Sequence, residues 1–115
     1  MRYWLIAALL LTGASPLWAA QNTLTWTDNA INEDHFIVER KAEDCTLTAL
    51  PFTVIVTSLP VNTQVFIDAT VTEGVTYCYR VAAGNVDATS DYSNLAGRRV
   101  PFTKPASPSA LTVGP

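Results

Sequence analysis

Residues 76–83 constrain the fold of this chain more than any other stretch, because their side chains alternate in character along an extended strand. One face would carry Tyr77, Tyr79, Val81 and Ala83, and the other would carry Cys78, Arg80 and Ala82. A period of two with apolar residues on one face is typical of a β-strand that buries that face. The stretch therefore predicts the central strand of a packed β-sheet protein.

Further stretches have the composition of short strands and follow one another at a spacing of roughly ten residues. They are residues 24–27, 36–41, 52–56, 64–68 and 92–100. Turn-forming residues such as Asp28-Asn29 and Glu73-Gly74 separate them, and no stretch of useful length has the period of a helix. Strands of this length and spacing predict an all-β sandwich or barrel.

The N-terminus predicts a secretory signal peptide over residues 1–19. It begins with Met1-Arg2, continues through apolar residues 5–11 and ends in the small residues Ala19 and Ala20. A basic start, a short apolar centre and small residues at the cut are typical of such a peptide. The apolar run is shorter than the roughly 20 residues of a membrane span. We therefore expect a secreted protein, extracellular or periplasmic, and a retained membrane anchor is the alternative.

The charge balance argues against nucleic acid and anionic lipid as partners. The chain has 7 Lys and Arg residues against 10 Asp and Glu residues, and the predicted signal peptide takes Arg2 with it. A mildly acidic chain without a basic stripe does not attract phosphate groups. No later stretch is long and apolar enough to predict a membrane span in the processed chain.

Several motifs taken together resemble a fibronectin type III domain of the bacterial kind. They are Leu24-Thr25-Trp26-Thr27-Asp28, residues 33–40, 65–68 and 74–83, and Asp91-Tyr92-Ser93-Asn94. The resemblance covers residues 24–100 of a domain expected at 20–100, and implies an antiparallel immunoglobulin-like sandwich with Tyr77 as its corner tyrosine. The core expected on this basis comprises Leu24, Trp26, Phe36, Val38, Tyr77, Tyr79 and Val81. The resemblance also implies a non-catalytic binding, adhesion or structural module, without a cofactor, that contacts a protein or glycan.

The tail, residues 101–115, departs from this family. Members begin with a strand that has no room here before residue 24, yet Pro108, Leu111 and Val113 have the spacing of that strand, after a Pro-rich linker. A linker of up to nine residues reaches about 30 Å, and a strand measures about 25 Å, so completion of the chain's own sheet is strained but feasible. The segment 108–113 could instead pair with the next copy, giving a self-assembling structural subunit, or be a disordered stub or the start of another domain.

Cys45 and Cys78 are the cysteines of the chain. In an exported protein an even number favours a disulfide over a metal site or a nucleophile. The resemblance places both at one end of the sandwich, with Cys78 pointing away from the core. A bond there would stabilise the fold by about 3–4 kcal/mol. Free thiols are the alternative.

At the opposite end the expected loops bring together acidic residues that are candidates for a binding surface, namely Asp28, Glu33, Asp34, Asp87 and Asp91. They could bind Ca²⁺ or a basic partner, but Asp also stabilises turns through its own backbone, which is the interpretation we favour. We therefore expect no metal site. His35 has no nucleophile motif to accompany it, so we expect no enzymatic activity.

Overall fold

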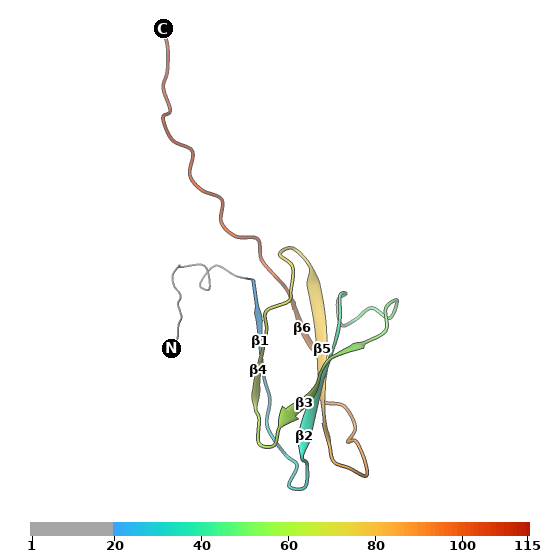
Figure 1. The fold of residues 1–115 in the computed structure, drawn as a ribbon. Coiled ribbons are helices and arrows are strands. Elements are labelled where there is room, and N and C mark those ends of the chain that lie inside the picture. The colour runs from blue at the N-terminus through green and yellow to red at the C-terminus, as the bar shows by residue number, and fades with distance from the viewer. Residues whose placement is uncertain (1–19) are drawn as a thin grey trace, which may run out of the picture.

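The computed structural model describes residues 20–115, which fold into antiparallel strands with no helix among them (Figure 1). The predicted signal peptide lies outside the described residues and stays a prediction. The strands are β1 (Asn22–Thr25), β2 (His35–Lys41), β3 (Thr53–Pro60), β4 (Val65–Asp68), β5 (Thr76–Gly84) and β6 (Ala96–Arg99). Nothing in the described part is a helix that could span a membrane.

The strands form two sheets that face each other, which confirms the expected antiparallel β-sandwich. One sheet pairs β1 with β4, and the other has the order β3-β2-β5-β6 (Figure 1). In the small sheet Asn22 lies opposite Asp68 and Leu24 lies opposite Phe66. These inward residues are partly or fully buried, whereas their neighbours on the outer face, such as Ile67, are exposed. The period of two therefore points one face of the small sheet at the large one.

β5 is the central strand, as the alternation predicts, and pairs with β2 on one side and β6 on the other. Of the residues expected in the core, those on β2 and β5 are buried, and Val71 and Val100 join them. The buried cluster is Phe36, Val38, Val71, Tyr77, Tyr79, Val81 and Val100. Leu24 and Trp26, which were expected in the core, are only partly buried and pack against its edge.

The last strand is shorter than the expected 92–100, because side chains replace part of its backbone pairing. Ser93 Oγ accepts a hydrogen bond from Val81 N at 3.0 Å, and Ser90 Oγ accepts one from Ala83 N at 2.9 Å. The serine hydroxyls thus satisfy β5 amides that a regular strand would otherwise pair with. Regular pairing begins only at Ala96.

The tail leaves the sandwich where β6 ends and extends away from it (Figure 1). Residues 108–113 form no strand within this chain, so the structure does not show the tail completing the chain's own sheet; pairing with another copy stays a prediction. Leu111 and Val113 are each 95% exposed. The segment is unpaired within this chain, and Ala110 has a φ of 55°, outside the extended region. We call the end of the sandwich that the tail leaves the exit pole, and the opposite end the loop pole.

Candidate functional site

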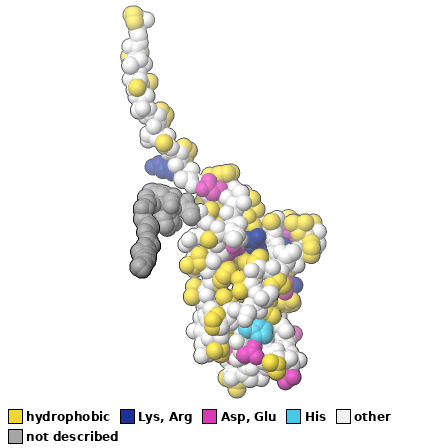
Figure 2. Space-filling model, viewed as in Figure 1, with side chains coloured by type: hydrophobic (Ala, Val, Ile, Leu, Met, Phe, Trp, Pro, Cys, Tyr) yellow, Lys and Arg dark blue, Asp and Glu magenta, His cyan; other side chains and the backbone are white. Residues whose placement is uncertain are grey.

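The loop pole includes the β1–β2 and β5–β6 loops, which contact each other as expected. Asp34 N donates to Gly84 O at 2.8 Å, and Asn85 Nδ2 donates to Asn32 O at 3.2 Å. Figure 2 shows acidic side chains and the histidine grouped at this end. The two loops therefore form one surface that is held by hydrogen bonds rather than by burial.

The predicted acidic residues come to this pole, but they do not converge on one point. Asp28 Oδ1 accepts from Ala30 N at 3.1 Å, and Glu33 Oε2 accepts from Asn62 N at 3.3 Å. The carboxylate of Asp34 contacts His35 Nδ1, and Asp87 and Asp91 are exposed. Within residues 20–115, no group of three or more His, Cys, Asp or Glu side chains is placed to hold a metal ion. The carboxylates of Asp28 and Glu33 therefore act as turn and loop braces.

Sequence reasoning missed two apolar side chains at the tips of these loops. Ile31 is 98% exposed and Val86 is 91% exposed. Each is next to a turn-forming residue, Asn32 and Asn85 respectively, and these two asparagines are the residues that link the loops. The signal was in the sequence, since an isolated apolar residue among turn-forming residues has no inward face to occupy. The pole thus presents apolar tips within an acidic surround.

His35 has a structural environment. Its imidazole lies against Gly84, where an added Cβ would come within 2.6 Å of Nε2. The nearby serines are bound to the backbone, since Ser90 Oγ donates to Asp91 O and Ser93 Oγ donates to Asn94 O, each at 2.8 Å. In the described chain these hydroxyls are braces of the β5–β6 loop, and none forms a nucleophile–base pair with the histidine.

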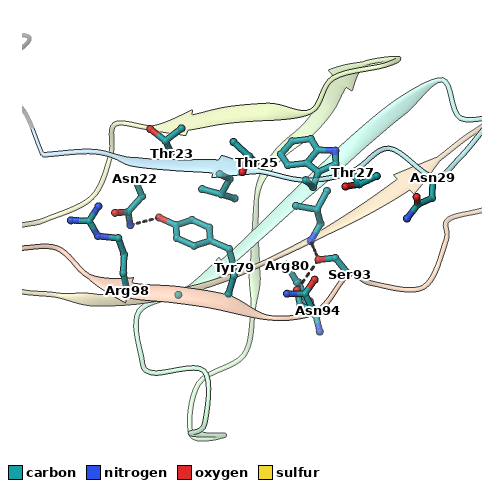
Figure 3. A pocket seen from close by; sticks show the side chains of 15 residues that line it. Asn22, Thr23, Thr25, Thr27, Asn29, Tyr79, Arg80, Ser93, Asn94 and Arg98 are labelled. Atoms are coloured by element: carbon teal, nitrogen blue, oxygen red, sulfur yellow. Dashed lines mark hydrogen bonds between the residues drawn. The ribbon is translucent and has the colours of Figure 1, made fainter.

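A groove of about 700 Å³ runs beside β1, between the outer edge of that strand and β6 (Figure 3). Its lining includes Leu24, Trp26, Tyr79 and Val81. The missing first strand, noted from the sequence, leaves the edge of β1 open. The sequence did not predict the groove, because its far wall is the short strand β6, whose four residues are all exposed.

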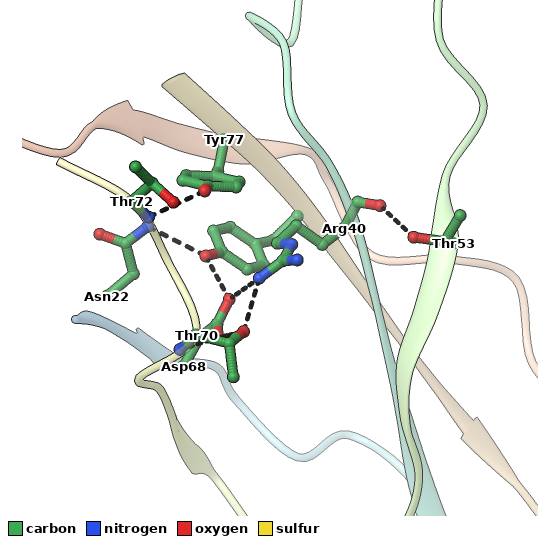
Figure 4. Close-up of polar contacts among 8 residues, drawn as sticks. Asn22, Arg40, Thr53, Asp68, Thr70, Thr72 and Tyr77 are labelled. Carbon is green, nitrogen blue, oxygen red and sulfur yellow. Dashed lines mark hydrogen bonds and ion pairs between the residues drawn. The ribbon is translucent and has the colours of Figure 1, made fainter. Parts of the chain in front are cut away.

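A buried polar network, shown in Figure 4, includes two residues that line this groove, Asn22 and Tyr79. Asn22 Nδ2 donates to the Tyr79 hydroxyl at 2.9 Å, which donates to Asp68 Oδ2 at 2.7 Å. Arg40 Nη1 donates to the same carboxylate oxygen at 2.8 Å, and Thr70 Oγ1 donates to Asp68 Oδ1 at 2.6 Å. The network ties the small sheet to the large one, since Asn22 and Asp68 belong to the former and Arg40 and Tyr79 to the latter.

The network shifts the ionisation of its members. Burial raises the pKa of Asp68, but hydrogen bonds from Thr70, Tyr79 and Arg40 outweigh burial and hold that pKa below its usual value. Burial, together with donation to Asp68, raises the pKa of Tyr79 to about 12. A carboxylate stabilised as an anion and a hydroxyl kept protonated form a fixed charge-assisted hydrogen bond, beside the ion pair of Asp68 with Arg40. This arrangement suits cross-sheet bracing and does not supply a general acid or base near neutral pH.

The outer face of β5 carries the expected disulfide and a stacked arginine. Cys45 and Cys78 are bonded, with their Cα atoms 5.1 Å apart. Cys78 is fully buried although it points away from the core, because the segment after β2 folds over it. Beside it the Arg80 guanidinium lies 4.1 Å from the centre of the Phe52 ring and 3.6 Å from that of Tyr92. The disulfide and the stacked side chains therefore cover this face of β5.

Comparison with known proteins supports the architecture alone. No model of a known protein family matches the chain, and no curated protein matches it. Among solved structures, one described as "Myokine structure" is similar to it with a TM-score of 0.53 and 19% sequence identity. The similarity covers 73% of this chain and 85% of that one. At this level of identity, the likeness shows that the chain has a β-sandwich fold of a kind already known.

Proposed function

We propose that this chain is a secreted, non-catalytic module of the fibronectin type III kind that acts through contacts with a protein or glycan. The corner tyrosine supports the family assignment. Tyr77 hydroxyl accepts a hydrogen bond from Thr72 N, five positions upstream, at 2.9 Å. A tyrosine near the start of the corresponding strand, bonded to the backbone just upstream, is a hallmark of immunoglobulin-like sandwiches.

The single observation that carries the functional part is the pair of exposed apolar tips at the loop pole. Ile31 and Val86 project from loops that are hydrogen-bonded to each other. Binding residues lie preferentially on loops that a rigid scaffold positions, and apolar groups exposed within a polar rim are typical of contact sites. The disulfide supports export, since such bonds persist in oxidising compartments.

The test measures binding of the labelled, purified protein to cell surfaces and glycan arrays. We expect saturable binding that the double variant Ile31→Asp, Val86→Asp abolishes. Thr57→Asp is the matched control, since Thr57 is exposed on β3 at the edge of the large sheet, and it should bind as the wild type does. Binding that survives the loop variant, or its absence in the wild type, would refute a loop-pole contact.

The second candidate function is a structural subunit that assembles with copies of itself. What favours it is the groove beside β1 together with the exposed Leu111 and Val113 of the tail. Negative-stain images of concentrated protein test it: filaments or linear oligomers are expected, and particles of single-domain size at every concentration would exclude it.

A further inference from the structure

The open edge of β1 has backbone groups in position for another strand. Trp26 N donates to Gln64 O at 3.1 Å, which continues the β1–β4 pairing in register. Residues that alternate with Trp26 in an antiparallel ladder direct their N–H and C=O groups the other way, and these are Thr23, Thr25 and Thr27. Within residues 20–115 the small sheet contains β1 and β4 alone. Such an edge is a template for an added strand.

The groove along that edge has an apolar floor and unsatisfied polar atoms. Leu24, Trp26 and Val81 line it, and the first two are only partly buried. Asn22 is 2% exposed, yet its Oδ1 has no hydrogen-bond partner in the described chain, and neither does the buried Trp26 Nε1. Buried polar atoms without partners are uncommon in native structures and call for an explanation. An occupant that brings apolar side chains and hydrogen-bonding groups would supply one.

The base of the tail is fixed so that the tail points away from its own groove. Gly74 N donates to Val100 O at 2.7 Å, and the Phe102 ring lies against Gly74, where an added Cβ would meet it at 2.4 Å. Thr103 N donates to Glu73 Oε1 at 3.2 Å, and its hydroxyl donates to Glu73 Oε2. These hydrogen bonds hold the pKa of Glu73 below its usual value. The chain therefore becomes free only after residue 103.

This anchor leaves too little chain for the tail to complete its own sheet. β1 starts at the exit pole (Figure 1), so an antiparallel partner must begin at the loop pole, beyond Thr27. From Asn22 to Thr27 the strand covers about 17 Å. Residues 104–108 also reach about 17 Å when taut, and they must cross to the groove and reverse direction as well. A copy stacked above the exit pole has no such difficulty, because the tail enters its groove from the loop pole and runs antiparallel to β1.

We propose that residues 108–113 of one copy insert into the groove of the next copy as an added strand antiparallel to β1. This deepens the second candidate function and rests on it. Leu111 and Val113 share one face of an extended strand and point into the groove over Trp26 and Leu24. The intervening Thr112 then lies opposite Thr25 on the outer face. Pro108, which lacks an N–H, lies just past the paired region, where it costs no hydrogen bond.

The inserted strand extends a chain of subunits without closing it. Each copy donates its tail at the exit pole and receives another copy's tail from the loop-pole end of its groove, so the contact is heterologous. A heterologous contact that does not return to the first subunit makes an open filament. Affinity comes from backbone pairing, and specificity comes from the apolar side chains at alternate positions.

The test uses the chain from Ala20 to Pro115, which contains every strand that the structure describes, with its disulfide intact. Trp26 is the lone tryptophan of this range and lines the groove. We expect sedimentation to show oligomers that grow with concentration, and tryptophan emission to shift to shorter wavelength as they form. Leu111→Asp should abolish both effects. Thr112→Asp, which adds the same charge one position away on the outer face, should retain them.

Each alternative gives a different result. A wild type that stays monomeric with constant emission overturns both the inserted strand and the self-assembling function. Oligomers that Leu111→Asp leaves intact overturn the inserted strand but keep self-assembly. A monomer whose emission changes on Leu111→Asp shows a tail folded onto its own groove and overturns donation. If Thr112→Asp abolishes oligomers as fully as Leu111→Asp does, the proposal that Leu111 faces the groove and Thr112 faces outward is overturned.

Cross-linking tests the register. Thr25→Cys mixed with Thr112→Cys should form an intersubunit disulfide on a non-reducing gel. Thr25→Cys mixed with Ser109→Cys should not, because three residues along a strand separate Cα atoms by about 10 Å, beyond the reach of a disulfide. The reverse result would overturn the register. The loop variant Ile31→Asp, Val86→Asp should assemble normally, so loss of loop-pole binding and loss of assembly are separable.

Discussion

Replacement of Asp68 by Asn should destabilise the protein by about 3–5 kcal/mol, the usual cost of removing one member of a buried ion pair. Asp68 is 2% exposed and accepts hydrogen bonds from Arg40, Tyr79 and Thr70. Asn keeps the shape but loses the charge that compensates the Arg40 guanidinium. The whole free energy of unfolding of a domain is about 5–15 kcal/mol, so the effect should be large.

The effect should also depend on pH, and its sign follows from the lowered pKa of Asp68. A carboxyl whose pKa is lower in the folded state stabilises the fold above its unfolded pKa, which is about 3.9. That contribution disappears as the pH falls through the folded pKa. The difference between wild type and Asp68→Asn should therefore be constant from neutral pH down to about pH 4 and shrink below it.

Urea unfolding followed by Trp26 fluorescence measures both effects. The double variant Arg40→Met, Asp68→Leu is the control, because replacing both members of a buried pair by apolar residues costs much less than removing one. An Asp68→Asn variant within about 0.5 kcal/mol of the wild type, the range of ordinary surface changes, would refute the assigned role. So would a double variant that is less stable than Asp68→Asn.

Three further changes have defined outcomes. Replacing Cys45 and Cys78 by Ser should lower the free energy of unfolding by about 3–4 kcal/mol, because their bond spans a sequence separation of 33. Equal urea midpoints of the wild type with and without reductant would contradict this. Gly97→Ala should lower the free energy of unfolding by about 1–3 kcal/mol, because the added Cβ would lie 2.4 Å from the Tyr77 carbonyl oxygen. An unchanged urea midpoint would show that β6 shifts freely. The wild type should lose stability as the pH rises from the unfolded tyrosine pKa of about 10 through the folded Tyr79 pKa of about 12, and Tyr79→Phe should remove this loss. Identical alkaline stability profiles of the two proteins would show that the loss comes from another group.

Side-chain alternation was sufficient to predict the two central strands of the large sheet, β2 and β5. Phe36 and Val38 on β2 and Tyr77 and Tyr79 on β5 follow a period of two, and all are buried. Strong periodicity on central strands reports burial directly, since one face must leave water. The direction of Cys78 also followed from this pattern. Its complete burial did not, because that depends on how the segment after β2 folds back over the sheet.

The polar network was less accessible to sequence reasoning. Asp68 shares its face of β4 with Phe66, which was a usable sign that it points inward, but nothing in the sequence names its partner. Arg40 lies 28 positions away on the other sheet. Long-range polar pairs depend on how the two sheets pack, and periodicity along one strand carries no information on packing. The same limit hid the groove, since one wall belongs to β1 and the other to β6.

The small sheet links stability to assembly. A two-stranded sheet is marginal on its own, so β1 and β4 depend on contacts with the large sheet. At the exit pole the Asn22–Tyr79–Asp68 hydrogen bonds supply them, whereas along the open edge Leu24 and Trp26 are only partly covered. Insertion of Leu111 and Val113 would cover that edge. By linkage, anything that binds only the folded state stabilises it, so an occupied groove should raise the stability of the copy that receives the strand. Loss of the network would loosen the same edge, and Asp68→Asn should therefore weaken assembly as well as folding.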